Sequence, residues 1–131
     1  MHTSNKKDRE WEELVRSTGC CVTGATNDVE IHHVKGRKFK HNKILIGPKF
    51  ILPLHKSLHR VDASHPNAWH KNKKGFIEEF GDPRDLWNCV QAGIYAEELE
   101  RFFNGDPNVR NHREELGVTE EVGRAIMDCP I

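Results

Sequence analysis

Apolar residues recur at helical spacing in several parts of the chain, and each of these parts predicts an amphipathic helix. Near the N-terminus, Trp11, Leu14 and Val15 lie among charged residues, and Gly19 follows as a stop signal, so a short helix is predicted to pack on the core. The segments with this pattern are residues 5–17, residues 55–62, the stretch closed by Gly81, the stretch from Pro83 to about Asn104, and the stretch after the N-cap residue Thr119.

Short apolar runs between turn residues predict strands on both sides of a basic loop. In residues 29–34, Val29 and Ile31 alternate with polar neighbours, and this strand ends in a pair of histidines. The sequence FILPL at residues 50–54 predicts a buried strand after the loop. The segment between them, residues 35–49, is punctuated by glycine, asparagine and proline, and it predicts a long loop with a short extended piece at ILI.

The order of these elements predicts an α+β fold in one domain. Residues 20–22 read as a further strand, joined to the next one by a turn over residues 24–28. At 131 residues the chain is long enough for a single modest core. We expect an N-terminal helix within residues 1–18 to pack on a core formed by residues 19–81, and residues 82–131 to form a C-terminal helical extension.

The chain has no segment that favours a membrane or secreted protein. No apolar run reaches about 18 residues, and the N-terminal sequence MHTSNKKDREWEELVR lacks the apolar segment of a signal peptide, so we expect a cytoplasmic protein without a membrane partner. The four cysteines form no spaced framework, which favours reduced thiols. No C-x-x-C sequence occurs, so metal ligands would have to come mainly from histidine.

Charge is balanced over the whole chain but not along it. Lysine plus arginine equals aspartate plus glutamate at 20 each. Between Lys35 and Arg60 there are eight basic residues and no carboxylate, whereas residues 78–121 are rich in glutamate and aspartate. A basic face of this kind fits contact with phosphate, and a solvated loop is the competing interpretation. The residues assigned to nucleic-acid binding are Lys35, Arg37, Lys38, Lys40, Lys43 and Arg60.

Histidines lie on both sides of the basic loop. His32 and His33 end the first strand, and His55 and His59 share one face of the helix predicted after the second strand. Three imidazoles can hold a divalent cation and leave coordination positions open, which favours catalysis over a purely structural role. Because neighbouring strand residues point to opposite faces, we expect one member of the adjacent pair to bind metal and the other to act as a general base.

The segments IHHV, FILPLHKSLHR and WHKNKKGFIEEFG together resemble the HNH nucleases with the ββα-metal fold. The sequence looks most similar to the phage-encoded group that includes the RecA-dependent nuclease Ref. The resemblance covers about half of the chain, from Cys20 to Gly81. It implies a hairpin with a metal-binding helix, in which His32 is a metal ligand, His33 is the general base and His59 is the next ligand.

The resemblance places the third ligand beyond the hairpin and its helix. His70, Phe76, Phe80 and Gly81 reproduce the family spacing of histidine, five residues, aromatic, three residues, aromatic, glycine. One divalent cation, Mg, Mn, Zn or Ni, is the implied cofactor. His55 remains an alternative ligand because it shares a helix face with another histidine.

The chain departs from the family pattern at two places. Phe50 stands where the family has a central asparagine that braces the general base, and Asn42 in the basic loop is the candidate substitute. Many relatives also bind a structural zinc through cysteines on both sides of the hairpin, whereas this chain has cysteines on one side only. We therefore expect no complete structural zinc site.

The leading functional hypothesis is a metal-dependent DNA endonuclease or nickase. The resemblance connects it with phage DNA recombination, repair or processing, and it raises a host recombinase as a partner beside DNA. One alternative is a DNA-binding or recombination accessory module that uses the metal for stability and does not cut. Another alternative is a protein-interaction adaptor that uses the acidic C-terminal helices.

Overall fold

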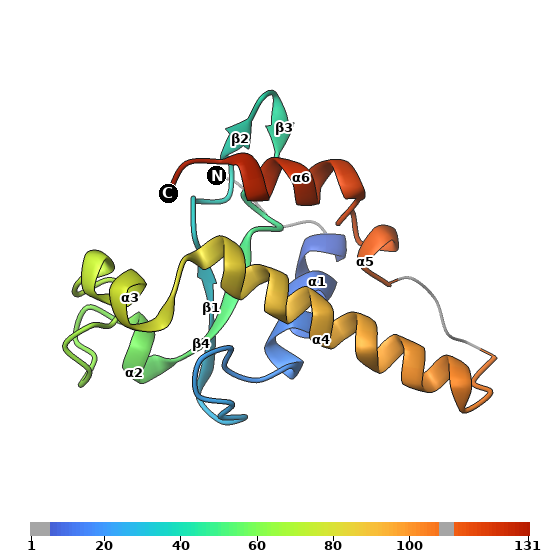
Figure 1. Cartoon of the computed structure of the whole chain (residues 1–131), viewed down its shortest axis with the longest axis horizontal. Helices are drawn as coiled ribbons and strands as arrows, with labels where there is room; N and C mark the ends of the chain where they lie inside the picture. The colour runs from blue at the N-terminus through green and yellow to red at the C-terminus, as the bar shows by residue number, and fades with distance from the viewer. Residues whose placement is uncertain (1–5, 108–111) are drawn as a thin grey trace.

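A computed structural model of the chain describes residues 6–107 and 112–131, in which helices surround a two-stranded antiparallel sheet (Figure 1). The sheet pairs β1 (Val29–His33) with β4 (Ile51–His55). The apolar run in β4 is buried, as expected for a strand covered on both faces. The predicted α+β class and the pairing of the two strands across the basic segment are confirmed.

The segment between β1 and β4 is more ordered than the predicted loop. Two short strands, β2 (Lys40–His41) and β3 (Ile44–Leu45), pair as a second antiparallel sheet. Asn42 and Lys43 between them have φ angles of 50° and 68°. Two successive left-handed residues form the tight turn that suits a two-residue hairpin, and asparagine tolerates this conformation. The middle of the basic segment is therefore a hairpin, which is held by its tight turn and by the pairing of β2 with β3.

The strand predicted at the cysteine pair is wrong. The backbone N–H of Cys20 donates to the carbonyl oxygen of Ala25 at 2.8 Å, and that of Gly24 donates to the oxygen of Cys20 at 2.9 Å. Gly19 and Gly24 have φ angles of 82° and 77°, which suit a left-handed turn and not a strand. This region is consequently a compact turn, and all four cysteines of the chain are free.

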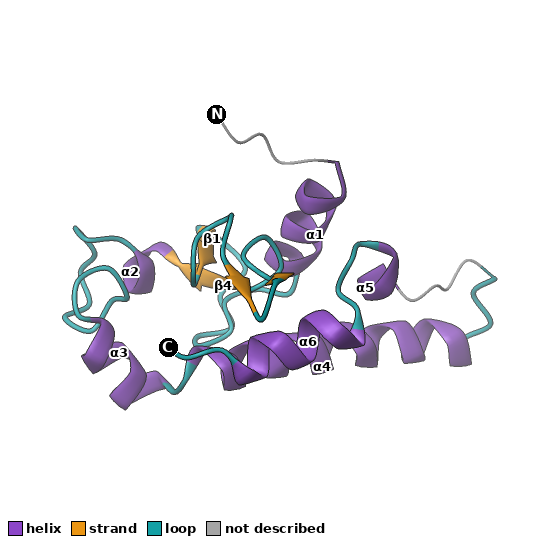
Figure 2. Cartoon of the chain, turned by 90° about the horizontal axis from the view of Figure 1, so that it is seen from above, coloured by secondary structure: helices purple, strands orange, loops and turns teal. Residues whose placement is uncertain are grey.

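Helices account for most of the remaining described structure (Figure 2). They are α1 (Lys6–Ser17), α2 (Lys56–His59), α3 (Lys73–Phe80), α4 (Pro83–Phe103), α5 (His112–Glu115) and α6 (Glu120–Asp128). Two of these helices begin at N-cap residues: the side chains of Asp82 and Thr119 accept hydrogen bonds from backbone N–H groups in the first turns of α4 and α6, respectively. None of the helices formed by the described residues is long and apolar enough to cross a membrane.

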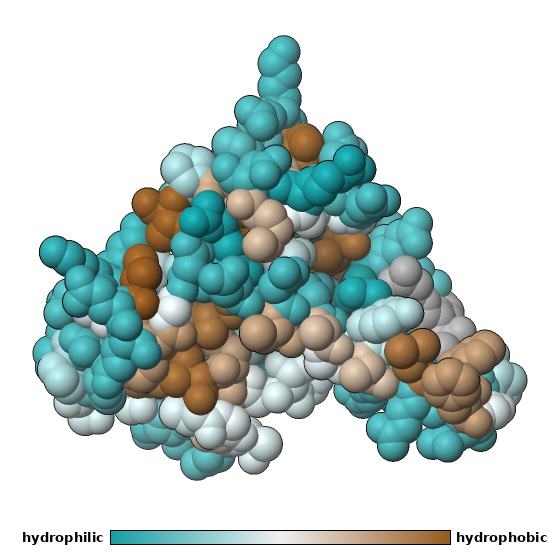
Figure 3. Space-filling view, viewed as in Figure 1, coloured by the Kyte–Doolittle hydropathy of each residue, from teal (hydrophilic) through white to brown (hydrophobic). Residues whose placement is uncertain are grey.

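The two halves of α4 have different surroundings. In its first half, Trp87, Val90 and Ile94 are buried in the core. Its second half extends beyond the body of the fold in Figures 1 and 2, and Phe102 and Phe103 there are 64% and 78% exposed. Figure 3 shows the resulting hydrophobic surface at the free end of this helix. Only the first half of α4 therefore contributes to the core.

Lys49, which lies two residues before β4, connects α1 and α4 to the sheet. Trp11 of α1 donates its indole N–H to the Lys49 carbonyl oxygen at 3.2 Å, and Trp87 of α4 donates to the same oxygen at 3.0 Å. The buried Lys49 ammonium pairs with Asp8 of α1 at 2.7 Å. Residues 1–5 of the predicted N-terminal segment lie outside the described residues, but α1 and α4 are integral to the core.

We expect the two indoles to be energetically coupled. Trp11→Phe and Trp87→Phe should each lower the free energy of unfolding by about 1–2 kcal/mol, since one donor remains in each variant. The double variant leaves the buried Lys49 carbonyl without an indole donor. Its free energy of unfolding should therefore fall by about 1 kcal/mol more than the sum of the two single-variant losses. Urea denaturation of the four proteins measures this coupling. Losses that add within about 0.3 kcal/mol would show that the shared carbonyl is unimportant.

Candidate metal centre and the adjacent histidine

Three histidines from separate elements meet beside the hairpin. They are His32 on β1, His59 at the end of α2 and His70 in the connection before α3. One ring nitrogen from each lies within 4.8 Å of the other two. The ring centroids are 4.9 to 5.3 Å apart. The structure thus brings together the three residues that the sequence nominated as ligands, and they are close enough to bind one metal ion.

Backbone contacts hold the three histidines in place. The register of the sheet pairs His32 with Leu52, and α2 begins directly after β4, which carries His59 back beside β1. The following connection is fastened to α2, because the N–H of Trp69 donates to the Leu58 oxygen at 2.8 Å and that of His70 donates to the His59 oxygen at 3.2 Å. The site is therefore built on hydrogen-bonded backbone and not on a free loop.

Burial keeps the central imidazole neutral. His32 is 1% exposed and packs on the Trp69 ring at a centroid distance of 4.7 Å. This burial, together with the nearby rings of His59 and His70, lowers the pKa of His32 to about 3. Burial and the adjacent His59 also lower the pKa of His70. A neutral imidazole offers a lone pair to a metal without first releasing a proton, so the cluster suits a cation.

The free ring nitrogens fit a metal ion. Among the described residues, the buried Nε2 of His32 has no hydrogen-bond partner. His59 uses Nδ1 to contact the Glu30 carboxylate at 3.0 Å, which leaves its Nε2 available. Ligand nitrogens about 2.1 Å from a common ion would be roughly 3–4 Å apart, so modest side-chain rotations would complete the site.

Glu30 is a component of the site that the sequence did not indicate. Its carboxylate contacts His59 and also accepts a hydrogen bond from Arg60 Nε at 2.7 Å. The Arg60 hydrogen bond is the main cause of a lowered pKa for Glu30, and the contact with His59 adds to it. A carboxylate held in this way orients the imidazole and increases its basicity as a ligand. The glutamate lies two residues before a ligand, but no spacing rule identified it.

The cluster of His32, His59 and His70 is open on one side. A surface hollow adjoins it, and the residues that line this hollow are Glu30, Ile31, His59, Arg60, Val61, Asp62 and His70. Two of the three candidate ligands therefore face space that a substrate can enter. An ion held by these three imidazoles would therefore have a coordination position open toward the hollow.

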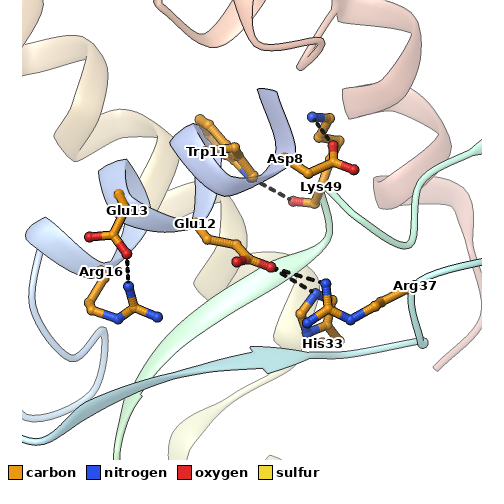
Figure 4. Close-up of polar contacts among 8 residues, drawn as sticks. All are labelled: Asp8, Trp11, Glu12, Glu13, Arg16, His33, Arg37 and Lys49. Carbon is orange, nitrogen blue, oxygen red and sulfur yellow. Dashed lines mark hydrogen bonds and ion pairs between the residues drawn. The ribbon is translucent and has the colours of Figure 1, made fainter. Parts of the chain in front are cut away.

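His33 lies on the other face of β1, toward α1 (Figure 4). Its Nε2 is 3.5 Å from Glu12 Oε1, and the same carboxylate oxygen lies 3.3 Å from the Arg37 guanidinium. Burial and then the positive charge of Arg37 lower the pKa of His33, while Glu12 and Asp8 oppose the shift. The adjacent pair therefore diverges as strand geometry requires, and only His32 belongs to the metal cluster.

Two predicted site residues are placed elsewhere. His55 lies outside the group of histidines and caps α2, where its Nδ1 accepts from the N–H of Ser57. It is a capping residue here because it directly precedes the first turn of that helix. Asn42 occupies the turn of the β2–β3 hairpin and lines a hollow beside α6, whereas Glu12 and Arg37 are the charged groups next to His33. The expectation of an asparagine brace is corrected accordingly.

The predicted phosphate-binding residues divide into two groups. Lys38, Lys40 and Lys43 are exposed on or beside the β2–β3 hairpin. The others have intramolecular contacts: Lys35 lies over the Phe39 ring, Arg37 contacts Glu12, and Arg60 contacts Glu30. The exposed lysines are consequently the groups most available to a polyanion.

Comparisons with known proteins add no family to these observations. No protein-family model matches the chain, and no match was found among curated proteins or among solved structures. The interpretation of the metal cluster therefore depends on its own geometry and residue chemistry.

Metal binding should depend on the clustered histidines and not on His55. We expect one zinc or manganese ion per chain, and His70→Ala should weaken binding by more than about 100-fold, since outer-shell partners alone contribute about 10- to 100-fold. His55→Asn is the matched control, because asparagine retains an N-cap acceptor for α2. Isothermal titration calorimetry of the two variants and the wild type measures the metal affinity and the number of ions bound per chain. Equal affinity in His70→Ala would remove that residue from the site.

Acid should destabilise the metal-free protein through His32. In the unfolded chain this ring gains a proton below about pH 6.5, whereas in the folded chain it stays neutral to about pH 3, so the unfolded state binds more protons. The free energy of unfolding should thus fall as pH is lowered through this window, by up to about 1.4 kcal/mol per pH unit from this group. Urea titrations of wild type and His32→Leu between pH 6.5 and 4 test this. If the free energy of unfolding changed with pH by the same slope in both proteins, His32 would not be the cause of the acid destabilisation.

Proposed function

We propose that the chain is a metal-dependent DNA endonuclease or nickase of the HNH type with a ββα-metal fold. The observation that carries this proposal is the convergence of three imidazoles, including the unpartnered, buried Nε2 of His32, beside an open hollow. A two-stranded hairpin followed by a short helix supports them, which is the arrangement implied by the sequence resemblance. The resemblance also motivates a role in phage DNA recombination or repair.

The residues of the chain divide the chemistry between two faces of β1. His32, His59 and His70 would hold a divalent cation, which supplies positive charge that stabilises the phosphate oxygens. His33 would take the proton from an attacking water as the new oxygen–phosphorus bond forms. The bond from phosphorus to the leaving oxygen breaks in the same reaction, and that oxygen takes up a proton from solvent. A phosphodiester across the end of β1 would have one histidine on each side.

The basic hairpin would hold the substrate. Lys38, Lys40 and Lys43 are exposed on the segment that follows β1 in the sequence. Contacts from lysine to phosphate depend on charge and not on base identity. We therefore propose DNA as the substrate, bound mainly through its backbone.

Cleavage should require His33 while metal binding should not. His33→Ala is expected to reduce the rate of plasmid nicking by about 100-fold or more, because general-base catalysis contributes about 10²- to 10⁴-fold. His65→Ala is the control, since His65 lies outside the cluster and its Nδ1 accepts from Asn67 N–H. Undiminished nicking by His33→Ala would remove the proposed base. DNA and metal binding without cleavage by the wild type, with Mg, Mn, Zn or Ni, would favour the accessory-module hypothesis.

A further inference from the structure

Glu12 of α1 is turned toward the sheet, while the nearest carboxylates along the helix, Glu10 and Glu13, face solvent. The side chain of Glu12 is 16% exposed, compared with 51% for Glu10 and 73% for Glu13 on the same helix. Its Oε1 lies between His33 and Arg37, at 3.5 Å from His33 Nε2 and 3.3 Å from the guanidinium (Figure 4). Burial of a carboxylate is unfavourable unless specific partners compensate, so this contact is a defined feature of the fold.

The helix that carries Glu12 is firmly attached. Asp8, one turn earlier on α1, forms the buried ion pair with Lys49, and Trp11 donates to the Lys49 carbonyl oxygen. Both residues precede Glu12 on α1, so these contacts restrain the turn of helix from which Glu12 reaches β1. Arg37 adds a charge-assisted contact to the same carboxylate oxygen. Glu12 is therefore placed by α1 and oriented by the basic segment.

The Glu12 carboxylate is the acceptor that lies nearest to hydrogen-bond distance from His33 Nε2. Among the described residues, the buried Nε2 of His33 has no hydrogen-bond partner, and at 3.5 Å the Glu12 oxygen is just beyond hydrogen-bond length. A shift of about 0.5 Å brings this pair to an ordinary hydrogen bond. Contacts of this kind are often long in the unliganded protein and shorten when the site is assembled.

We propose that Glu12 is the positioning residue for His33: its carboxylate accepts the Nε2–H and thereby fixes the ring with the Nδ1 lone pair free. The role of that lone pair as a base rests on the proposed nuclease function. The positioning itself is a property of the folded chain. Glu12 acts through His33 and touches neither the metal cluster nor the substrate. In this arrangement the N-terminal helix completes the site, although the resemblance to HNH nucleases does not extend to it.

The test is a comparison of Glu12 with its exposed neighbour Glu13 in the full-length, zinc-loaded protein. Glu13 pairs with Arg16 on the outer side of α1, so Glu13→Gln removes a carboxylate from the same helix without touching His33. In ¹H–¹⁵N spectra of the histidine rings, we expect the wild type and Glu13→Gln to show His33 in the Nε2–H form with a slowly exchanging, downfield proton. Glu12→Gln should weaken this signal, and Glu12→Ala should abolish it.

Activity provides a second measurement. Glu12→Gln should lower kcat for plasmid nicking by about 10- to 100-fold, with zinc affinity and KM for DNA unchanged, as expected for a residue that orients a catalytic group. Glu13→Gln should leave kcat unchanged. If the wild type does not nick DNA, the nuclease proposal fails, and the ring spectra still decide the positioning role. An unaltered His33 signal in Glu12→Ala would overturn that role whatever the activity.

Discussion

Two indole N–H groups share the carbonyl oxygen of Lys49, and the placement of the site depends on this contact. Trp11 of α1 and Trp87 of α4 are far apart in the sequence, and both donate to the same buried acceptor. A buried carbonyl without a donor would cost about 1–3 kcal/mol, so the two indoles satisfy an obligatory requirement. Because this residue lies just before β4, the contact fixes where that strand begins. The register of β4 with β1 then determines where the histidines of β1 lie.

The alternation of side chains along β1 separates two kinds of chemistry. His32 turns toward α2 and α3 and joins two further imidazoles, while His33 turns toward α1 and meets Glu12. A strand forces this divergence, since neighbouring residues point to opposite faces. The consequence is that metal binding and proton transfer can be supported by different parts of the fold. The helix α1, which lies outside the segments that carry the family resemblance, contacts His33 through Glu12.

The electrostatics of the site also follow from the packing. Burial and the neighbouring rings lower the pKa of His32 to about 3, and burial also lowers the pKa of His70. Positive charge is kept outside the cluster, on the exposed lysines of the β2–β3 hairpin and on Arg60, which is neutralised by Glu30. A neutral set of lone pairs attracts a cation, and an exposed basic surface attracts a polyanion. The histidine cluster and the exposed lysines therefore occupy distinct parts of the fold.

The sequence by itself determined the elements with local signals: the capped helices, the strand that ends at His33, the buried FILPL strand, and the histidines nominated through motif spacing. Caps and apolar periodicity act over a few residues, so they can be read without a fold. The tertiary structure alone decided that Glu30 braces His59, 29 residues away, and that Glu12 rather than Asn42 lies beside His33. It also decided that His55 caps a helix. These outcomes depend on which faces of distant segments meet, and that is settled only when the helices and the hairpin share one core.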